Sequence, residues 1–275
     1  MNALNRFFFE IDADSFFKRA IPLLYLSGIY FFWQHDWTPY IQMSQYLFSP
    51  QGLLSFLGLS YPSASTILIL QLTGSISCLL TIFVKKVRPI SSFLVFFLLL
   101  ILDFFSNGFG FINVQIHLIW FFLVFALVLS FESLRWFKTF AFRMLELIVV
   151  LAYLQSFLSK MIIAGSAWGI DGTVLQIGIL RQGLPYGLFI VQSNLLSKFL
   201  CSGALIFEAA FALYFFLPPK LKKVLLGTGI LFHISTFVFL GIGFYHLWVM
   251  NACIILFAYR EVSNGPSLAT TTYEL

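Results

Sequence analysis

Long apolar stretches separated by short polar segments run through most of this chain. Eight of them stand out, at residues 16–33, 65–84, 89–105, 112–131, 139–160, 196–217, 223–244 and 246–259. A helix needs about 20 predominantly apolar residues to cross the hydrocarbon core of a bilayer. The pattern therefore predicts an all-α fold, a polytopic membrane bundle of about eight transmembrane helices.

The composition excludes a soluble domain. Of the 275 residues, 60% are hydrophobic and only 10% are charged, with a mean hydropathy of +0.94. A soluble domain carries about 25% charged residues. The three cysteines lie inside apolar stretches, without CxxC spacing. We therefore expect no disulfide framework, no metal site, and the lipid bilayer as the main partner.

The basic residues indicate the orientation in the membrane. They cluster before the first apolar stretch and after the second, fourth, sixth and eighth, and the exceptions are Lys160, Arg181 and Lys198. Excess lysine and arginine mark cytoplasmic loops. This alternation predicts eight spans with both termini cytoplasmic. It also accounts for the net charge of +5 without a nucleic-acid partner.

Three regions are expected along the chain. Residues 1–15 are predicted to form an amphipathic segment, with Phe7, Phe8, Ile11 and, just after it, Phe17 facing lipid. Residues 16–260 form the membrane domain, and residues 261–275 a polar tail. Within the domain, segments 34–64 and 161–195 are too apolar for free loops and too broken for spans. We expect interfacial or re-entrant pieces there, on the non-cytoplasmic side.

Polar residues inside the apolar stretches are the candidates for chemistry, because a charge in hydrocarbon costs at least about 2.5–3.5 kcal/mol. The predicted topology puts Asp103, His117 and Lys160 near the outer ends of their helices. Glu208 and His233 fall midway along successive helices, where they could meet as a carboxylate–imidazole pair.

Each candidate also has a structural interpretation. Lys160 could snorkel to the interface, His117 could be a packing histidine, and Glu208 with His233 could only join two helices. Glu146 follows Arg143 by three residues, the spacing of neighbours on a helix, so this pair is expected to be structural.

The order of several residues resembles a known family. Tyr153 lies seven positions before Lys160, and Trp168 and the Asp171-Gly172 pair follow. This arrangement resembles a stretch of the vitamin K-dependent γ-glutamyl carboxylases. Downstream, Glu208 and the Phe-His ending at His233 resemble the family's acidic and histidine positions in successive helices, and upstream His117 resembles a histidine that opens a helix. The likeness extends over the horizontally transferred transmembrane (HTTM) domain.

The resemblance implies specific roles. The lysine matched by Lys160 is the base that starts oxygenation of reduced vitamin K, and the histidine matched by His117 assists carboxylation. Asp103, Tyr153, Trp168, Asp171, Glu208 and His233 would then line the pocket. A dry pocket favours a neutral lysine, because burial disfavours the ammonium form. The implied cofactor is reduced vitamin K or menaquinol.

Three functions remain open at this point. The first is an HTTM-class membrane enzyme that acts on a quinone or a peptide. Short HTTM proteins also resemble the SdpB type, the bacterial sporulation-delaying peptide maturation proteins. The second function is therefore maturation or export of a secreted antimicrobial peptide with a partner subunit. The third is a transporter or a scaffold. No Asn-x-Ser/Thr sequon occurs, which argues against a eukaryotic secretory protein. We expect a bacterial inner membrane, with the site facing its non-cytoplasmic side.

Overall fold

The computed structural model describes residues 12–35, 37, 41–42, 48–49, 53–56, 58, 62–108, 116–165, 168, 171–182 and 185–258. In these residues every regular element is a helix. The main helices are α2 (Ala13–Trp33), α5 (Ala64–Phe83), α6 (Arg88–Gly108), α7 (Ile116–Ser130), α8 (Arg135–Ser159), α12 (Asn194–Ala210), α13 (Pro219–Leu240) and α14 (Tyr245–Phe257). Short helical pieces join or extend them, namely α4 (Leu53–Phe56), η2 (Lys85–Val87), η3 (Lys160–Ala164), α10 (Thr173–Gln182), η4 (Pro185–Gly187), α11 (Leu188–Val191) and η5 (Phe211–Phe216).

The predicted all-α class is confirmed, and each of the eight apolar stretches coincides with one main helix, with ends shifted by a few residues. Five helices of the described chain are long and apolar enough to cross a membrane, namely Ala64–Phe83, Lys85–Gly108, Arg135–Ile163, Asn194–Phe216 and Pro219–Leu240. Two apolar helices, α7 and α14, are shorter. The chain is therefore an integral membrane protein.

Capping residues explain several helix ends. The Ser63 hydroxyl accepts a hydrogen bond from the Thr66 backbone N–H at 3.1 Å where α5 begins, and Asp12 does the same for α2. Such caps satisfy N–H groups that the first turn of a helix leaves without partners. Helix α13 begins with Pro219 and ends at Gly241, which adopts the left-handed conformation typical of a C-terminal glycine.

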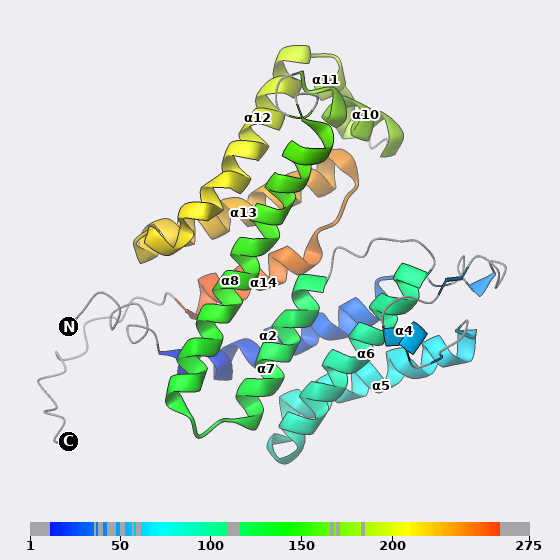
Figure 1. Cartoon of the computed structure of the whole chain (residues 1–275), viewed down its shortest axis with the longest axis vertical. Coiled ribbons are helices and arrows are strands. Elements are labelled where there is room, and N and C mark those ends of the chain that lie inside the picture. Colours follow the sequence, from blue (N-terminus) through cyan, green and yellow to red (C-terminus); the bar gives the residue numbers. More distant parts are fainter. Residues whose placement is uncertain are drawn as a thin grey trace, which may run out of the picture.

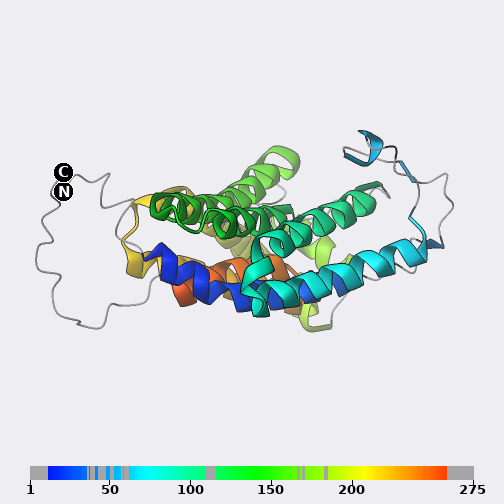
Figure 2. The ribbon, with the colours of Figure 1, turned by 90° about the horizontal axis from the view of Figure 1, so that it is seen from below.

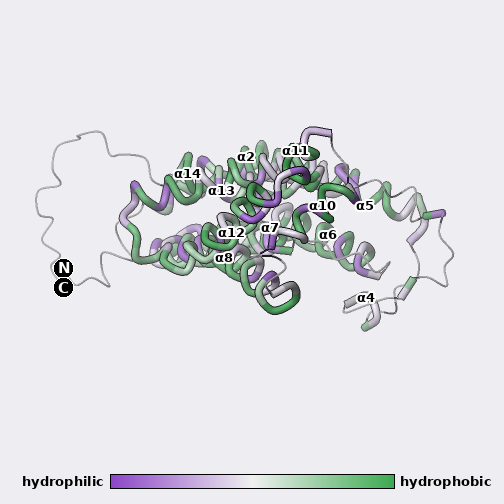
Figure 3. Tube along the Cα trace, turned by 90° about the horizontal axis from the view of Figure 1, so that it is seen from above, coloured by the Kyte–Doolittle hydropathy of each residue, from purple (hydrophilic) through white to green (hydrophobic). Residues whose placement is uncertain are grey.

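The helices form two connected groups. Helix α5 packs between α2 and α6, and α6 packs against α7. Helix α8 packs against α7, α2 and α12, while α14 contacts α13, α2, α7 and α8, so α8 and α14 join the groups (Figure 1). Seen from below, α2 and α5 lie on one side of the molecule (Figure 2). Hydrophobic residues predominate along the helices (Figure 3), as expected of helices in a membrane.

Phenylalanine side chains fill the contact between α2, α7 and α8. The rings of Phe16 and Phe142 lie 4.8 Å apart and those of Phe17 and Phe125 lie 4.9 Å apart, both in edge-to-face geometry. Helices α2 and α5 approach closely where Gly74 faces Phe32, because a Cβ atom at residue 74 would lie 2.2 Å from that ring. Small residues at such contacts are typical of membrane helices, whose association depends on close packing.

The predicted Arg143–Glu146 pair is confirmed. A guanidinium nitrogen of Arg143 lies 2.5 Å from the Glu146 carboxylate, which is fully buried. The Tyr214 hydroxyl donates to the other Glu146 oxygen at 2.9 Å, and the Lys222 ammonium lies 3.8 Å from that oxygen. Because these residues come from α8, η5 and α13, the pair also holds three elements together.

The two expected outer segments contain only short helices in their described parts. Segment 34–64 includes α4, and segment 161–195 includes α10 and α11, which lie close to the start of α12 (Figure 1). Their placement at an interface stays a prediction. The expectation that Phe17 faces lipid was wrong, because its side chain is buried with its ring 4.9 Å from that of Phe125. Phe7, Phe8 and Ile11, also expected to face lipid, lie outside the described residues, as does the polar tail 261–275.

Candidate functional site

Lys160 lies where α8 ends, and its ammonium forms an ion pair with the Glu208 carboxylate of α12. The same ammonium donates to the Ser156 hydroxyl at 3.0 Å, and that hydroxyl donates to Glu208 Oε1, also at 3.0 Å. Ser156 precedes Lys160 by four residues, so the two side chains share one face of α8. Lysine, serine and carboxylate therefore contact one another in a closed triangle, which we call the Lys160 centre.

The backbone changes its winding at Lys160. Residues Lys160–Ala164 form a π-helical turn, which ends at Gly165 with φ of +50°. π-Helical turns are rare and are often found at functional sites. Lys160 is therefore the first residue of the wider π-helical turn that follows the regular α-helix.

The Lys160 centre is largely shielded from solvent. Glu208 is only 1% exposed, while the Lys160 side chain keeps 20% of its surface accessible. The indole ring of Trp168 lies 5.2 Å from the Lys160 ammonium, within the range of a cation–π contact. Buried charges of this kind are tolerated when they are paired, and losing one partner leaves the other charge uncompensated.

A second polar group surrounds Tyr153, two helical turns before Lys160 on α8. Its hydroxyl accepts a hydrogen bond from the Asn251 amide of α14 at 2.7 Å and lies 3.1 Å from His233 Nε2 of α13. The Tyr153 ring stacks on Phe211 with 3.7 Å between centroids. All three polar residues are buried. We call Tyr153, His233 and Asn251 the Tyr153 cluster.

Gly229 makes room for this cluster. A Cβ atom there would lie 2.4 Å from the Tyr153 hydroxyl oxygen and 2.8 Å from Asn251 Nδ2. A side chain at residue 229 would therefore displace the groups that form the hydrogen bonds. The glycine on α13 lets the tyrosine of α8 reach the asparagine of α14.

The Lys160 centre and the Tyr153 cluster are neighbours. Tyr153 lies within electrostatic range of Glu208, and His233 lies within electrostatic range of Lys160. The rings of Phe207 and Phe232, which directly precede Glu208 and His233, lie 5.1 Å apart. The sequence suggested that Glu208 and His233 could meet as a pair. In the structure Glu208 instead contacts Lys160, and His233 contacts Tyr153.

The remaining candidates have other contacts. His117 Nε2 lies 3.2 Å from the Gln155 amide oxygen on α8, and Asp103 accepts from Asn107 at 3.1 Å. Asp171 is exposed and accepts a hydrogen bond from the Thr173 backbone N–H at 2.9 Å where α10 begins. Hydrogen bonds from the Thr173 side chain and backbone hold the pKa of Asp171 below its ordinary value. The structure thus brings five of the eight candidates together, namely Lys160, Glu208, Trp168, Tyr153 and His233.

Sequence reasoning missed three residues of this region. Two of them, Ser156 and Asn251, are polar residues inside apolar helices. Their polar character at these positions could have identified both as candidates. The third is His246, which is buried and lies within electrostatic range of His233 and His117. In the described part of the chain, no group of three or more His, Cys, Asp or Glu residues could hold a metal ion.

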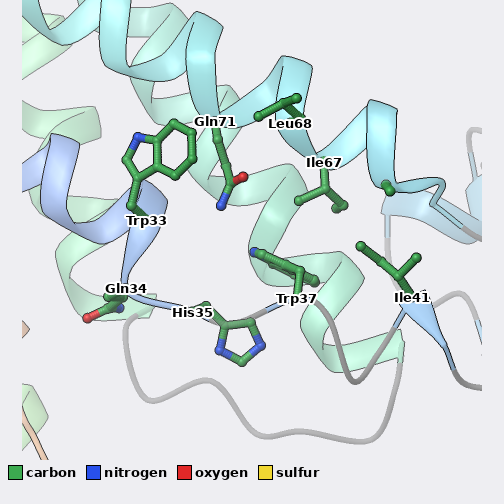
Figure 4. Close-up of a pocket in the computed structure, with 9 residues that line it drawn as sticks. Trp33, Gln34, His35, Trp37, Ile41, Ile67, Leu68 and Gln71 are labelled. Atoms are coloured by element: carbon green, nitrogen blue, oxygen red, sulfur yellow. The ribbon is translucent and has the colours of Figure 1, made fainter.

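A separate pocket of about 400 Å³ opens between the end of α2 and the start of α5 (Figure 4). It is lined by Trp33, Gln34, His35, Trp37, Ile41, Ala64, Ile67, Leu68 and Gln71. None of the sequence-predicted site residues lines it. The described lining residues supply indole, imidazole and amide groups to its walls.

Comparison of the chain with protein-family models, with curated proteins and with solved structures finds no match. The resemblance to the HTTM domain therefore stays a prediction that rests on the residues quoted above.

Proposed function

We propose that this chain is an HTTM-class membrane enzyme in which Lys160 accepts a proton from a lipid-soluble acid such as reduced vitamin K or menaquinol. The observation that carries this proposal is the buried Lys160–Glu208 ion pair beside a π-helical turn. In a membrane protein, an ionisable pair away from bulk water is expensive to maintain and is usually functional.

The proposal includes a topology of eight spans with both termini cytoplasmic. Helices α2, α7 and α14 complete the count alongside the five helices that are long and apolar enough to cross a membrane. One contact supports the orientation, because it brings together two helix ends that carry basic residues. Lys138, near the start of α8, pairs with Asp14, near the start of α2. The Lys160 centre lies toward the opposite end of α8 and, in this topology, on the non-cytoplasmic side.

The ion pair provides a simple way to prepare a base. When the shared proton moves from the Lys160 ammonium to Glu208, it leaves a neutral amine and a neutral carboxylic acid. The amine lone pair then accepts the proton of a substrate hydroxyl, so that an O–H bond breaks and an N–H bond forms. The Ser156 hydroxyl forms hydrogen bonds with both groups and so keeps them in position relative to each other. Proton transfer by a positioned side chain typically contributes a rate factor of about 10²–10⁴.

Apolar surface surrounds the approach to Lys160. Met161, Ile162 and Ile163 of the π-helical turn are exposed, and Ile162 and Ile163 each keep about four-fifths of their surface accessible. A lipid-soluble ring can reach a partly exposed ammonium from this side without crossing water. The Trp168 indole adds a flat face next to the same ammonium. These features suit a quinol better than a water-soluble acid.

The test uses purified protein in lipid nanodiscs supplied with reduced vitamin K or menaquinol, oxygen and bicarbonate. Quinone epoxide is measured by mass spectrometry for the wild type, Lys160→Ala and Lys198→Ala. Lys198 is an exposed lysine of α12 and serves as the matched control. We expect epoxide from the wild type and Lys198→Ala and its loss in Lys160→Ala. Absence of epoxide from all three proteins would reject quinol oxidation and favour peptide maturation of the SdpB type.

Proton-coupled transport is a second candidate, because Glu208 and His233 are buried ionisable residues on adjacent helices. It predicts a different pattern. Flux coupled to protons would be lost in Glu208→Gln and retained in Lys160→Ala. The enzyme proposal instead predicts loss of activity in both variants.

A further inference from the structure

The pocket between the end of α2 and the start of α5 is large enough for a small ligand. Its volume is about 400 Å³, and it shares no lining residue with the Lys160 centre or the Tyr153 cluster. Ligand pockets typically span about 300–1,000 Å³, and a cavity of about 150 Å³ already holds one benzene ring. A ligand with two fused rings therefore fits this space.

The side-chain amide of Gln71 has one defined orientation in this pocket. Its Nε2 donates to the Phe32 backbone carbonyl at 2.8 Å, in the last turn of α2, where carbonyl groups have no partner within the helix. Because a carbonyl can only accept, the amide nitrogen must make this contact. Figure 4 shows the amide oxygen on the side of Ile67, another lining residue. No described residue donates to this oxygen, so Gln71 offers the pocket an acceptor.

The indole of Trp33 offers the pocket its flat face. Its Nε1 donates to the Ser75 hydroxyl at 2.8 Å, and that hydroxyl donates to the Gln71 backbone carbonyl, also at 2.8 Å. The polar edge of the indole is therefore engaged by α5. The ring of Trp37 contributes a second aromatic wall and lies 4.7 Å from that of His35, in edge-to-face geometry. Aromatic rings of this kind pack favourably against a planar ligand.

The lining favours a neutral ligand. None of the nine described residues that line the pocket is Asp, Glu, Lys or Arg. Indole faces also attract cations, but a charge taken out of water is costly unless it is paired. A neutral ring avoids this cost.

Apolar side chains connect the pocket with the surface of α5. Leu68 lines the pocket and keeps 47% of its surface accessible. Leu72 and Ile76 follow at intervals of four residues and are exposed as well, so the three side chains share one face of the helix. A lipid-soluble ligand can therefore reach the pocket along this face.

We propose that this pocket binds the ring of a lipid-soluble phenol or hydroquinone, with the ligand hydroxyl donating to Gln71 Oε1 and the ring against the indole of Trp33. A quinone carries only carbonyl acceptors and cannot make the bond to Gln71, so the site distinguishes a hydroxyl-bearing ring from its oxidised form. The inference does not depend on the proposed function, because it uses no residue of the Lys160 centre.

The test compares two ring probes that differ in one donor. Binding of 6-fluoro-2-naphthol and of 6-fluoro-2-methoxynaphthalene to the full chain in nanodiscs is measured by ¹⁹F NMR, and empty nanodiscs correct for partition into lipid. The methoxy compound keeps the rings and the oxygen but has no hydroxyl proton. We expect the naphthol to bind the wild type about fivefold more tightly, the change that a hydrogen bond of average strength produces. Equal affinities would overturn the proposal.

Gln71→Leu identifies the acceptor. This variant should bind the two probes with equal affinity, because its side chain accepts no hydrogen bond. A preference that arose from the size of the methoxy group would persist in Gln71→Leu, and that result would overturn the role of Gln71. A variant whose only effect is structural would change the affinities for both probes alike and keep their ratio.

A second pair of variants tests the location and leaves Gln71 in place. Ala64 lines the pocket and Ser65 does not, and both are exposed at the start of α5. Ala64→Phe should fill the space and abolish binding of the naphthol, whereas Ser65→Phe should retain it. Binding that survives Ala64→Phe would reject this pocket as the site. None of these measurements uses quinol turnover, so a negative epoxide assay would leave their result intact.

Discussion

Lys160 and Glu208 lie 48 residues apart in the chain and form a direct ion pair between α8 and α12. The Ser156 hydroxyl, 3.0 Å from both the ammonium and the carboxylate, closes the arrangement. One side chain of the pair is almost fully buried and the other is partly accessible. The pair therefore combines a structural link between two helices with an ammonium group that keeps part of its surface accessible.

The ion pair should show strong energetic coupling. Lys160→Met or Glu208→Leu alone is expected to lower the free energy of unfolding by about 3–5 kcal/mol, because each leaves a buried charge without its partner. The double variant should lose much less than the sum of the two. Unfolding in bicelles measures all three, and additive losses would contradict the pairing. Lys198→Met should change stability by at most about 0.5 kcal/mol, as surface substitutions do.

Gly229 should not tolerate a methyl group. Gly229→Ala is expected to cost about 1–3 kcal/mol, the range for overpacking, because the new Cβ would collide with the Tyr153 hydroxyl. Gly227→Ala is the control on the same helix, since a Cβ atom there meets nothing within 4 Å. Thermal unfolding of both variants in nanodiscs checks this. Equal midpoints would contradict the close approach of α8 and α13.

Glu146 should be important for stability without being needed for chemistry. Glu146→Gln removes the buried carboxylate charge that Arg143 contacts and is expected to cost about 3–5 kcal/mol. Glu132→Gln changes an exposed carboxylate and should cost at most about 0.5 kcal/mol. Chemical unfolding gives both values. If the enzyme proposal is right, epoxide formation per folded molecule remains unchanged in both variants.

Asp171 should make the start of α10 sensitive to acid. Its pKa is lowered in the folded chain by hydrogen bonds from Thr173, so the stabilisation is present above the ordinary value of 3.8 and is lost as the pH falls through the folded pKa. Hydrogen exchange of the first α10 amides should accelerate in that window. In Asp171→Asn, which caps without titrating, exchange should show no such acid step. A step of equal size in Asp171→Asn would assign it to another group.

The proposed topology can be tested by accessibility. Lys86→Cys in η2 and Arg181→Cys in α10 place thiols at exposed positions that we assign to opposite sides of the membrane. In intact vesicles of one orientation, a membrane-impermeant maleimide should label Arg181→Cys from the non-cytoplasmic side and Lys86→Cys from the other. The native cysteines are buried and provide a low background. Labelling of both from one side would contradict the eight-span arrangement.

The helices could be predicted from the sequence because their signals are local. Runs of apolar residues, the serine before α5 and the proline that begins α13 each act within one or two turns. The same holds for Arg143 with Glu146, which are neighbours on one helix. The seven-residue spacing of Tyr153 and Lys160 likewise put both on one face of α8, since seven residues make nearly two turns.

The partners of the buried polar groups depended on tertiary structure. The sequence put Glu208 and His233 at the middle of successive helices, but periodicity does not say which helices touch or how they are rotated. Helix packing brings Glu208 to Lys160 and His233 to Tyr153, while Asp171 accepts a hydrogen bond at the start of α10. The sequence by itself determined the class of the protein and its candidate groups. Contacts between helices distant in the chain decided which of those groups form a site, because side-chain partners follow from helix packing.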